Sequence, residues 1–249
     1  MYQFVDSVLG SESYGGPIGL SVTVLEEDMR VPQKKGTKGS LKWLQELINE
    51  TPTLLQQHIN QNLTIPLEPI TWLSPLKSDQ YAEYRDGSFL EVLGLGKFKS
   101  RLRDFWPRNG PQWDALGRVS AGGPYFLVEA KANIPEIMSN MGAKSEKSIA
   151  LIRKSLSETR QFLKCKDSEL WEKGFYQYAN RIAHLYFLRQ ICKVDAYLIF
   201  LYFLNDHTHI PTTRDQWAGA LELQKSLLGL KSHKLQKFIS DFFVDVTDK

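Results

Sequence analysis

The pattern of apolar and polar positions predicts a helical N-terminal part that leads into a central β-hairpin. Apolar side chains recur at helical spacing in 40–48 and again in 52–63, where Thr51 is a suitable cap and Pro52 occupies the first turn. A strand is predicted at 20–26, between glycine-rich stretches. The proline-rich stretch 63–76 is incompatible with a long helix and is expected to cross the surface in extended form.

The middle of the chain predicts a helix and then a hairpin. The helix is expected from Ser78 to about Gly94 or Gly96. Residues 113–119 alternate in polarity, "SAGGP" supplies a turn, and 125–132 return as a second strand. Strand side chains alternate between the two faces, so Glu129 and Lys131 share one face of an otherwise apolar strand.

The remaining pattern predicts helices on either side of one buried strand. Helical regions are expected at 135–163 and 169–191, and again at 214–230 and 232–243. Residues 195–204 are apolar on both faces, which is typical of a strand covered on both sides of a sheet. Strands joined by helical crossovers indicate an α/β core.

The charges within the hairpin suggest a metal site. A lone buried carboxylate is costly, and a divalent cation would offset that cost. Glu129, joined by Asp114 across the hairpin if the register allows, supplies the oxygen ligands that Mg²⁺ (or Mn²⁺) prefers. Lys131 could orient or help deprotonate a metal-bound water and stabilise charge on a phosphate. These parts suit hydrolysis of a phosphodiester. The alternative is an internal ion pair between Glu129 and Lys131, without metal.

Asp114 followed by Glu129-Ala130-Lys131 on the next strand resembles the PD-(D/E)XK nuclease superfamily. The stretches "FWPRNGPQWDAL", "LVEAKA" and "YQYANRIAHLYFL" resemble a bacterial branch of it, and the resemblance covers roughly 78–204. It implies a restriction-endonuclease-like core with a central mixed sheet flanked by helices. It also implies that Asp114 and Glu129 bind the metal and that Lys131 serves the water. Trp113 stands where the family pattern has proline.

The resemblance also points to two neighbouring segments. Glu83 would be the third acid, supplied by the first helix, and an exposed helix charge is the alternative. A polar stripe with Gln177, Asn180, Arg181 and His184 recurs at helical spacing in 176–189, and Gln177 matches a glutamine that several branches place on this helix. We expect the stripe to contact phosphate or bases, with Arg181 as the main phosphate ligand. The alternative is an ordinary exposed helix face.

A basic segment precedes the hairpin and is a candidate nucleic-acid contact. Its aromatic residues could stack on unpaired bases, whereas the alternative makes the cations a solvated face and the aromatics core. The cations expected to neutralise phosphates are Lys97, Lys99, Arg101 and Arg103.

Composition narrows the remaining choices. The 249 residues carry a net charge of only +3, so any basic site must be a local patch. The two cysteines form no CxxC pair, and they are expected to be free thiols in a cytoplasmic protein. No signal peptide or membrane span is expected. We expect an N-terminal extension at 1–77, a nuclease-like core at 78–206 and C-terminal helices packed on the core at 207–249.

The sequence therefore predicts a Mg²⁺-dependent nuclease-like protein that hydrolyses DNA in preference to RNA. The main alternative is a catalytically inert protein that keeps the nuclease fold and binds nucleic acid or another partner. Oligomeric state, including a homo-oligomer, is left open by the sequence.

Overall fold

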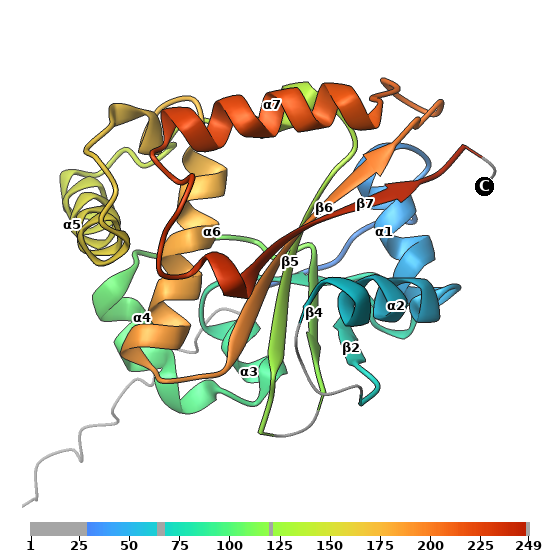
Figure 1. The fold of residues 1–249 in the computed structure, drawn as a ribbon. Coiled ribbons are helices and arrows are strands. Elements are labelled where there is room, and N and C mark those ends of the chain that lie inside the picture. The colour runs from blue at the N-terminus through green and yellow to red at the C-terminus, as the bar shows by residue number, and fades with distance from the viewer. Residues whose placement is uncertain (1–28, 64–67, 120–121, 248–249) are drawn as a thin grey trace, which may run out of the picture.

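The protein is an α/β structure built on one mixed sheet. The computed structural model describes residues 29–63, 68–119 and 122–247. Five strands lie in the order β2-β4-β5-β6-β7, with helices on both faces of the sheet (Figure 1). The pairs β2–β4 and β4–β5 are antiparallel, and the pairs β5–β6 and β6–β7 are parallel. The predicted α/β class with a central mixed sheet flanked by helices is confirmed.

The strands of the large sheet are β2 (Thr71–Ser74), β4 (Ala115–Arg118), β5 (Tyr125–Lys131), β6 (Ala196–Leu204) and β7 (Ile239–Asp245), and a small separate pair is formed by β1 (Arg30–Val31) and β3 (Glu83–Tyr84). The α-helices are α1 (Gly39–Asn49), α2 (Pro52–Asn62), α3 (Asp86–Leu93), α4 (Lys99–Phe105), α5 (Glu146–Leu163), α6 (Tyr176–Tyr186) and α7 (Arg214–Leu227). Short 3₁₀ turns occupy Lys77–Asp79, Gly96–Phe98, Ile134–Ile137, Glu169–Trp171 and Gln236–Phe238, and a π-helical turn, Phe187–Ile191, extends α6.

The two faces of the sheet carry separate hydrophobic cores, as strand alternation requires. Phe126 and Val128 of β5 pack in the core that includes α1 and α2. Leu127 lies in the other core, beneath α3 to α7. Glu129 and Lys131 have the same parity as Leu127, so they belong to that face, as the alternation of the sequence predicted.

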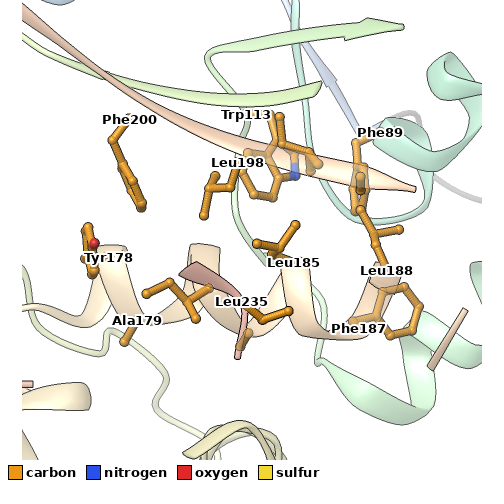
Figure 2. Packing of buried hydrophobic residues seen from close by; sticks show 14 of the residues in the cluster. Phe89, Trp113, Tyr178, Ala179, Leu185, Phe187, Leu188, Leu198, Phe200 and Leu235 are labelled. Carbon is orange, nitrogen blue, oxygen red and sulfur yellow. The ribbon is translucent and has the colours of Figure 1, made fainter. Parts of the chain in front are cut away.

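The inner strand β6 is buried along its whole length because it has a neighbour on each side and helices over each face. Helix α6 lies along one of those faces, with its apolar side chains directed at the strand (Figure 2). Tyr178 of α6 stacks on Phe200 of β6 with ring centroids 4.3 Å apart. This contact orients the start of α6 over the part of the sheet that contains Glu129.

Several predicted elements are confirmed and others are wrong. The two N-terminal helices and the hairpin agree with prediction, whereas the expected strand at 20–26 lies outside the described residues. The helix expected from Ser78 begins only at Asp86, because Glu83 and Tyr84 pair with β1 as a short strand. Glu83 is therefore not a helix residue.

The C-terminal prediction at 232–243 was also wrong, since the segment ends in β7 and not in a helix. Parallel pairing with β6 supplies the backbone hydrogen bonds of β7, and that long-range partner is invisible in the local pattern. The proline-rich stretch contributes edge strand β2, whose Trp72 is buried. Strands β2 and β7 thus join the same sheet as the residues between 78 and 206.

The helical predictions between the hairpin and β6 were too long. The region 135–163 is a 3₁₀ turn followed, after a gap, by α5, and the region 169–191 is helical α6 only from Tyr176. Both cysteines are free thiols, as expected. Within the described residues, no helix is long and apolar enough to cross a membrane.

Truncation of a buried side chain of β6 tests this packing. Ile199 is fully buried in β6, so Ile199→Ala should lower the free energy of unfolding by about 2–5 kcal/mol, through lost apolar burial and the cavity left behind. Leu223 of α7 is 58% exposed, and Leu223→Ala is the control, expected to change stability by about 0.5 kcal/mol or less. Urea unfolding measures both. Equal losses in the two variants would contradict the assignment of β6 as the core strand.

Candidate functional site

Three acids from separate segments form a row across neighbouring extended strands. Ala115 pairs with Val128 in the hairpin, and continuing that register by one pair sets Asp114 opposite Glu129. An antiparallel bridge between Tyr84 and Trp113 continues in the same way and sets Glu83 beside Asp114. The pairing of strands, and not closeness in sequence, therefore brings Glu83, Asp114 and Glu129 together.

Asp114 immediately precedes β4 and is held there by the neighbouring strand. Its Oδ2 accepts a hydrogen bond of 2.7 Å from the backbone N–H of Ala130. Burial of the Asp114 carboxyl disfavours its charged form, and the charges of Glu129 and Glu83 oppose ionisation further. The pKa of Asp114 therefore lies well above the usual value. Lys131 and the Ala130 hydrogen bond act in the opposite direction but do not prevail.

Glu129 is the most buried acid of the row, with 1% exposure, and it is paired with two cations. Its Oε1 accepts a hydrogen bond from Nζ of Lys131, and its Oε2 accepts one of 2.6 Å from Nε of Arg181. Burial alone would raise the pKa of Glu129, but the charges of Arg181 and Lys131 outweigh it and lower the pKa. Glu129 is therefore ionised.

Lys131 ends β5 and is partly buried beside two acids. Burial acts to lower its pKa, but the charges of Glu129 and Asp114 outweigh that effect and raise it. Lys131 is therefore an ammonium in this state and donates a proton to its hydrogen bond. The ion pair with Glu129 that we considered as an alternative is present, and it lies within the acid row.

Glu83 faces the site from β3, although the predicted helix is absent. Its Oε2 accepts hydrogen bonds from the side-chain amides of Gln112 and Gln33, the latter 3.2 Å long. The side chain is 7% exposed, and burial together with the charge of Glu129 raises its pKa despite these amides. The alternative of an exposed helix charge is therefore wrong for Glu83.

The polar stripe of α6 faces inward. Arg181 is 3% exposed, and besides Glu129 it donates to the carbonyl of Gln112 at 2.7 Å and to Oδ1 of Asn180 at 2.9 Å. Its guanidinium also lies over the ring of Trp113, 4.8 Å from the centroid. The guanidinium N–H groups of Arg181, which we expected to bind phosphate, are therefore used in hydrogen bonds within the protein. The alternative of an exposed helix face is wrong for Asn180 and Arg181.

Two other residues of this helix differ in their surroundings. Gln177 is partly exposed and lines a small cavity together with Glu129 and Lys131, so it is part of the site. His184 lies deeper, among the rings of Phe89, Phe105, Trp106 and Trp113, and burial lowers its pKa to about 3. His184 is therefore a neutral core residue.

The basic segment lies toward the opposite end of β5 from the acid row. Arg101 donates to the carbonyl of Ile191, shortly before β6 begins beside Tyr125. Tyr125 and Lys131 are separated by about 20 Å along β5, at roughly 3.3 Å per residue. Lys97, Arg101 and Arg103 are exposed, and Lys99 pairs with Glu91 at 2.8 Å. Phe105 and Trp106 are buried in the core, which leaves them no face for stacking on bases.

The carboxylate oxygens of the acid row are suitable ligands for a hard divalent cation. Asp114 and Glu83 both resist ionisation, first because they are buried and then because neighbouring carboxylates repel, and a bound cation would offset both effects. Carboxylate oxygens are the ligands that Mg²⁺ and Mn²⁺ prefer. Within the described ranges, no group of three or more His, Cys, Asp or Glu side chains is already arranged closely enough to hold a metal ion.

Three glutamines of the site were missed by sequence reasoning. Gln33 and Gln112 hold Glu83, and Gln224 of α7 lines the same cavity as Glu129 and Lys131. Gln33 and Gln112 lie in segments without periodicity. The position of Gln224 could have been recognised in the sequence. Trp217, Leu221 and Gln224 are separated by four and then three residues, which places Gln224 on the apolar face of its helix. A polar residue on such a face indicates a polar neighbour.

Comparisons with protein-family models, with curated proteins and with solved structures find no match to this chain. The site is therefore interpreted from its own geometry.

The raised pKa of Asp114 predicts a pH dependence of stability. The folded state binds this proton more tightly than the unfolded chain, so stability falls as pH rises above about 3.9, the ordinary aspartate value. Asp114→Asn removes the charge and keeps an acceptor for Ala130. It should raise the free energy of unfolding by about 1 kcal/mol at pH 7, and the gain should shrink toward pH 4. Urea unfolding across this range, without metal, measures the effect. A variant less stable than wild type at pH 7 would contradict the prediction.

The Arg181–Glu129 pair predicts a large and coupled loss of stability. Arg181→Leu leaves a buried carboxylate with Lys131 as its remaining cation, so it should cost about 3–5 kcal/mol. Adding Glu129→Gln should recover part of that loss, because the uncompensated charge is then gone. Arg153 is 60% exposed in its pair with Glu172, and Arg153→Leu is the control, expected to cost about 1 kcal/mol or less. Additive effects in the Arg181 and Glu129 double-mutant cycle would disprove the coupling.

Proposed function

We propose that this protein is a metal-dependent phosphodiesterase that cleaves nucleic acid, DNA in preference to RNA. The observation that supports this most is the meeting of Glu83, Asp114, Glu129 and Lys131 in one electrostatically coupled cluster. Three acids from separate segments, with an ammonium on the same strand as one of them, are the parts that a water attack on a phosphate diester requires. A cluster with this composition is a costly arrangement for stability alone.

The proposal includes the restriction-endonuclease-like fold. In favour of it, an antiparallel hairpin, β4–β5, is followed by helices α5 and α6 and then by β6, parallel to β5. The acid-alanine-lysine triplet lies at the end of the second hairpin strand, and the preceding acid lies at the start of the first. The order of elements and the positions of these residues agree with the resemblance of the sequence to that superfamily.

Asp114 and Glu129 are the residues that would hold the cation, with Glu83 as the third acid. A bound Mg²⁺ or Mn²⁺ would supply Lewis-acid polarisation of the phosphate and a more acidic water. The amides of Gln33 and Gln112 hold the carboxyl group of Glu83 in place, and its raised pKa means that a bound cation would have to favour its ionised form. Asp114 is fixed toward β5 by the N–H of Ala130.

Lys131 acts as a positive charge beside the reacting phosphate. Its raised pKa means that the side chain starts as an ammonium, which can donate a hydrogen bond to a phosphate oxygen as negative charge develops there. Its ion pair with Glu129 sets the direction of the side chain before substrate arrives.

Contact with the rest of the nucleic acid is proposed for exposed cations. Lys97, Arg101 and Arg103 lie on the surface of α4 and the turn before it, where they could neutralise phosphates away from the point of cleavage. Gln177 and Asn180 lie nearer the acid row, at the start of α6. Arg181 contributes by holding Glu129.

The second candidate is an inert protein that binds nucleic acid or another partner through this fold. The pairing of Glu129 favours it, because one carboxylate oxygen faces Lys131 and the other faces Arg181. A cation that bound Glu129 would have to displace or share these contacts. The two candidates differ in one measurable outcome, which is cleavage.

The test is a cleavage assay with Mg²⁺ or Mn²⁺ on single-stranded and double-stranded DNA and on RNA. Lys131→Met keeps most of the bulk and loses the charge. It should retain the fold and bind nucleic acid within a small factor, while hydrolysis slows by about a hundredfold or more. Lys173→Met is the matched control, since Lys173 is 71% exposed on the surface, and its rate should equal that of wild type.

Three outcomes separate the interpretations. Cleavage that needs metal and Lys131 supports the nuclease. Binding by every variant, with no cleavage by wild type on any substrate, supports the inert binding protein. A large fall in melting temperature for Lys131→Met, with neither binding nor cleavage in wild type, would identify a structural ion pair with Glu129.

A further inference from the structure

Helix α7 presents a buried amide to the acid row. Gln224 is 1% exposed, and its Oε1 has no hydrogen-bond partner within the described part of the chain. The other residues on this face are apolar, with Trp217 and Leu221 packed in the core. A buried acceptor without a hydrogen-bond partner is unfavourable. A glutamine at this position of an apolar helix face therefore indicates that its amide oxygen binds a ligand.

The helix holds Gln224 firmly in this position. Nε1 of Trp217 donates to the carbonyl of Phe203 in β6 at 3.0 Å, and Lys225 pairs with Asp241 of β7. The first turn is closed by a capping box between Thr213 and Gln216. The contacts on both sides of Gln224 therefore fix its position along α7.

Gln224 opens onto the small cavity beside Glu129 and Lys131. The cavity has a volume of about 10 Å³, which is close to the space that one water molecule needs. Its polar lining consists of Gln224, Gln177, Lys131 and Glu129, and Tyr178 and Phe200 form part of the apolar wall. One small volume with several polar side chains meets the requirements for a buried water and is too small for a larger ligand.

We propose that Gln224 is a positioning residue, whose amide binds one water molecule together with Lys131. Oε1 of Gln224 accepts a hydrogen bond from the water, and the ammonium of Lys131 donates one to the water oxygen. The water thereby gives Lys131 a second partner besides Glu129 and holds its Nζ toward α7. The catalytic part of this inference rests on the proposed function, whereas the water site itself does not.

The first experiment is crystallographic and uses the full chain without metal. A high-resolution structure of the wild type should contain one ordered water within hydrogen-bond distance of Gln224 Oε1 and Lys131 Nζ. In Gln224→Met the water should be lost, because methionine keeps the bulk and removes the acceptor. A dry cavity in the wild type, or an unchanged water in the variant, would overturn the proposal.

The second experiment separates positioning from a purely structural role. Gln224→Met should keep the melting temperature of the wild type or raise it, since it removes a buried polar group. It should lower kcat by roughly tenfold and leave KM unchanged, because the water supports Lys131 and not substrate binding. Gln161 is exposed on α5, and Gln161→Met is the control with wild-type kinetics.

The outcomes keep the two proposals apart. A water that is lost in Gln224→Met without a change in kcat would overturn the positioning role and leave the nuclease intact. If the wild type cleaves no substrate, the proposed function fails, and the crystallographic comparison still decides whether Gln224 and Lys131 share a water.

Discussion

The structure depends on how the charge of Glu129 is compensated inside a sheet. This carboxylate shares its face of β5 with the buried Tyr125 and Leu127 and with Lys131, and it is almost fully removed from solvent. An ion in such a place persists only with opposite charge and hydrogen bonds at close range. Arg181 from α6 and Lys131 from the same strand supply both. The position of α6 over the sheet is therefore tied to one side chain of β5.

That requirement organises the surrounding polar groups. Once Arg181 is turned inward, its remaining donors need acceptors, and these come from the backbone of Gln112 and the side chain of Asn180. Gln112 in turn donates to Glu83, which links the small sheet of β1 and β3 to the large one. This network joins Glu129 to Glu83, and Asp114 is connected to both through the repulsion of their charges, so the acid row behaves as one electrostatic unit.

The arrangement of the acid row also determines the protonation states of its carboxyl groups. Asp114 and Glu83 resist ionisation while Glu129 is ionised, so in this state one negative charge faces the two cations Arg181 and Lys131. A divalent cation would favour the ionised forms of Asp114 and Glu83, which would then serve as its carboxylate ligands. The inward pairing of Arg181 opposes this by satisfying Glu129 from within the protein. Under the proposed function, a bound cation and Arg181 would compete for the carboxylate of Glu129.

The sequence by itself determined the features that depend on local alternation and burial. The hairpin, the shared face of Glu129 and Lys131, the fully apolar β6 and the first two helices all follow from side-chain periodicity. Asp114 could be matched to Glu129 because a hairpin has a short connection, which limits the register. The acid-alanine-lysine pattern pointed to the same place.

Only the tertiary structure decided the features that depend on distant partners. Glu83 is in a strand because β1 pairs with it, and 239–245 is a strand because β6 does. Arg181 and Gln224 are inside because the polar groups they face lie on a sheet that is far away in sequence. A polar stripe on a helix looks the same whether it meets water or a buried carboxylate. The difference arises from packing, which local sequence patterns do not encode.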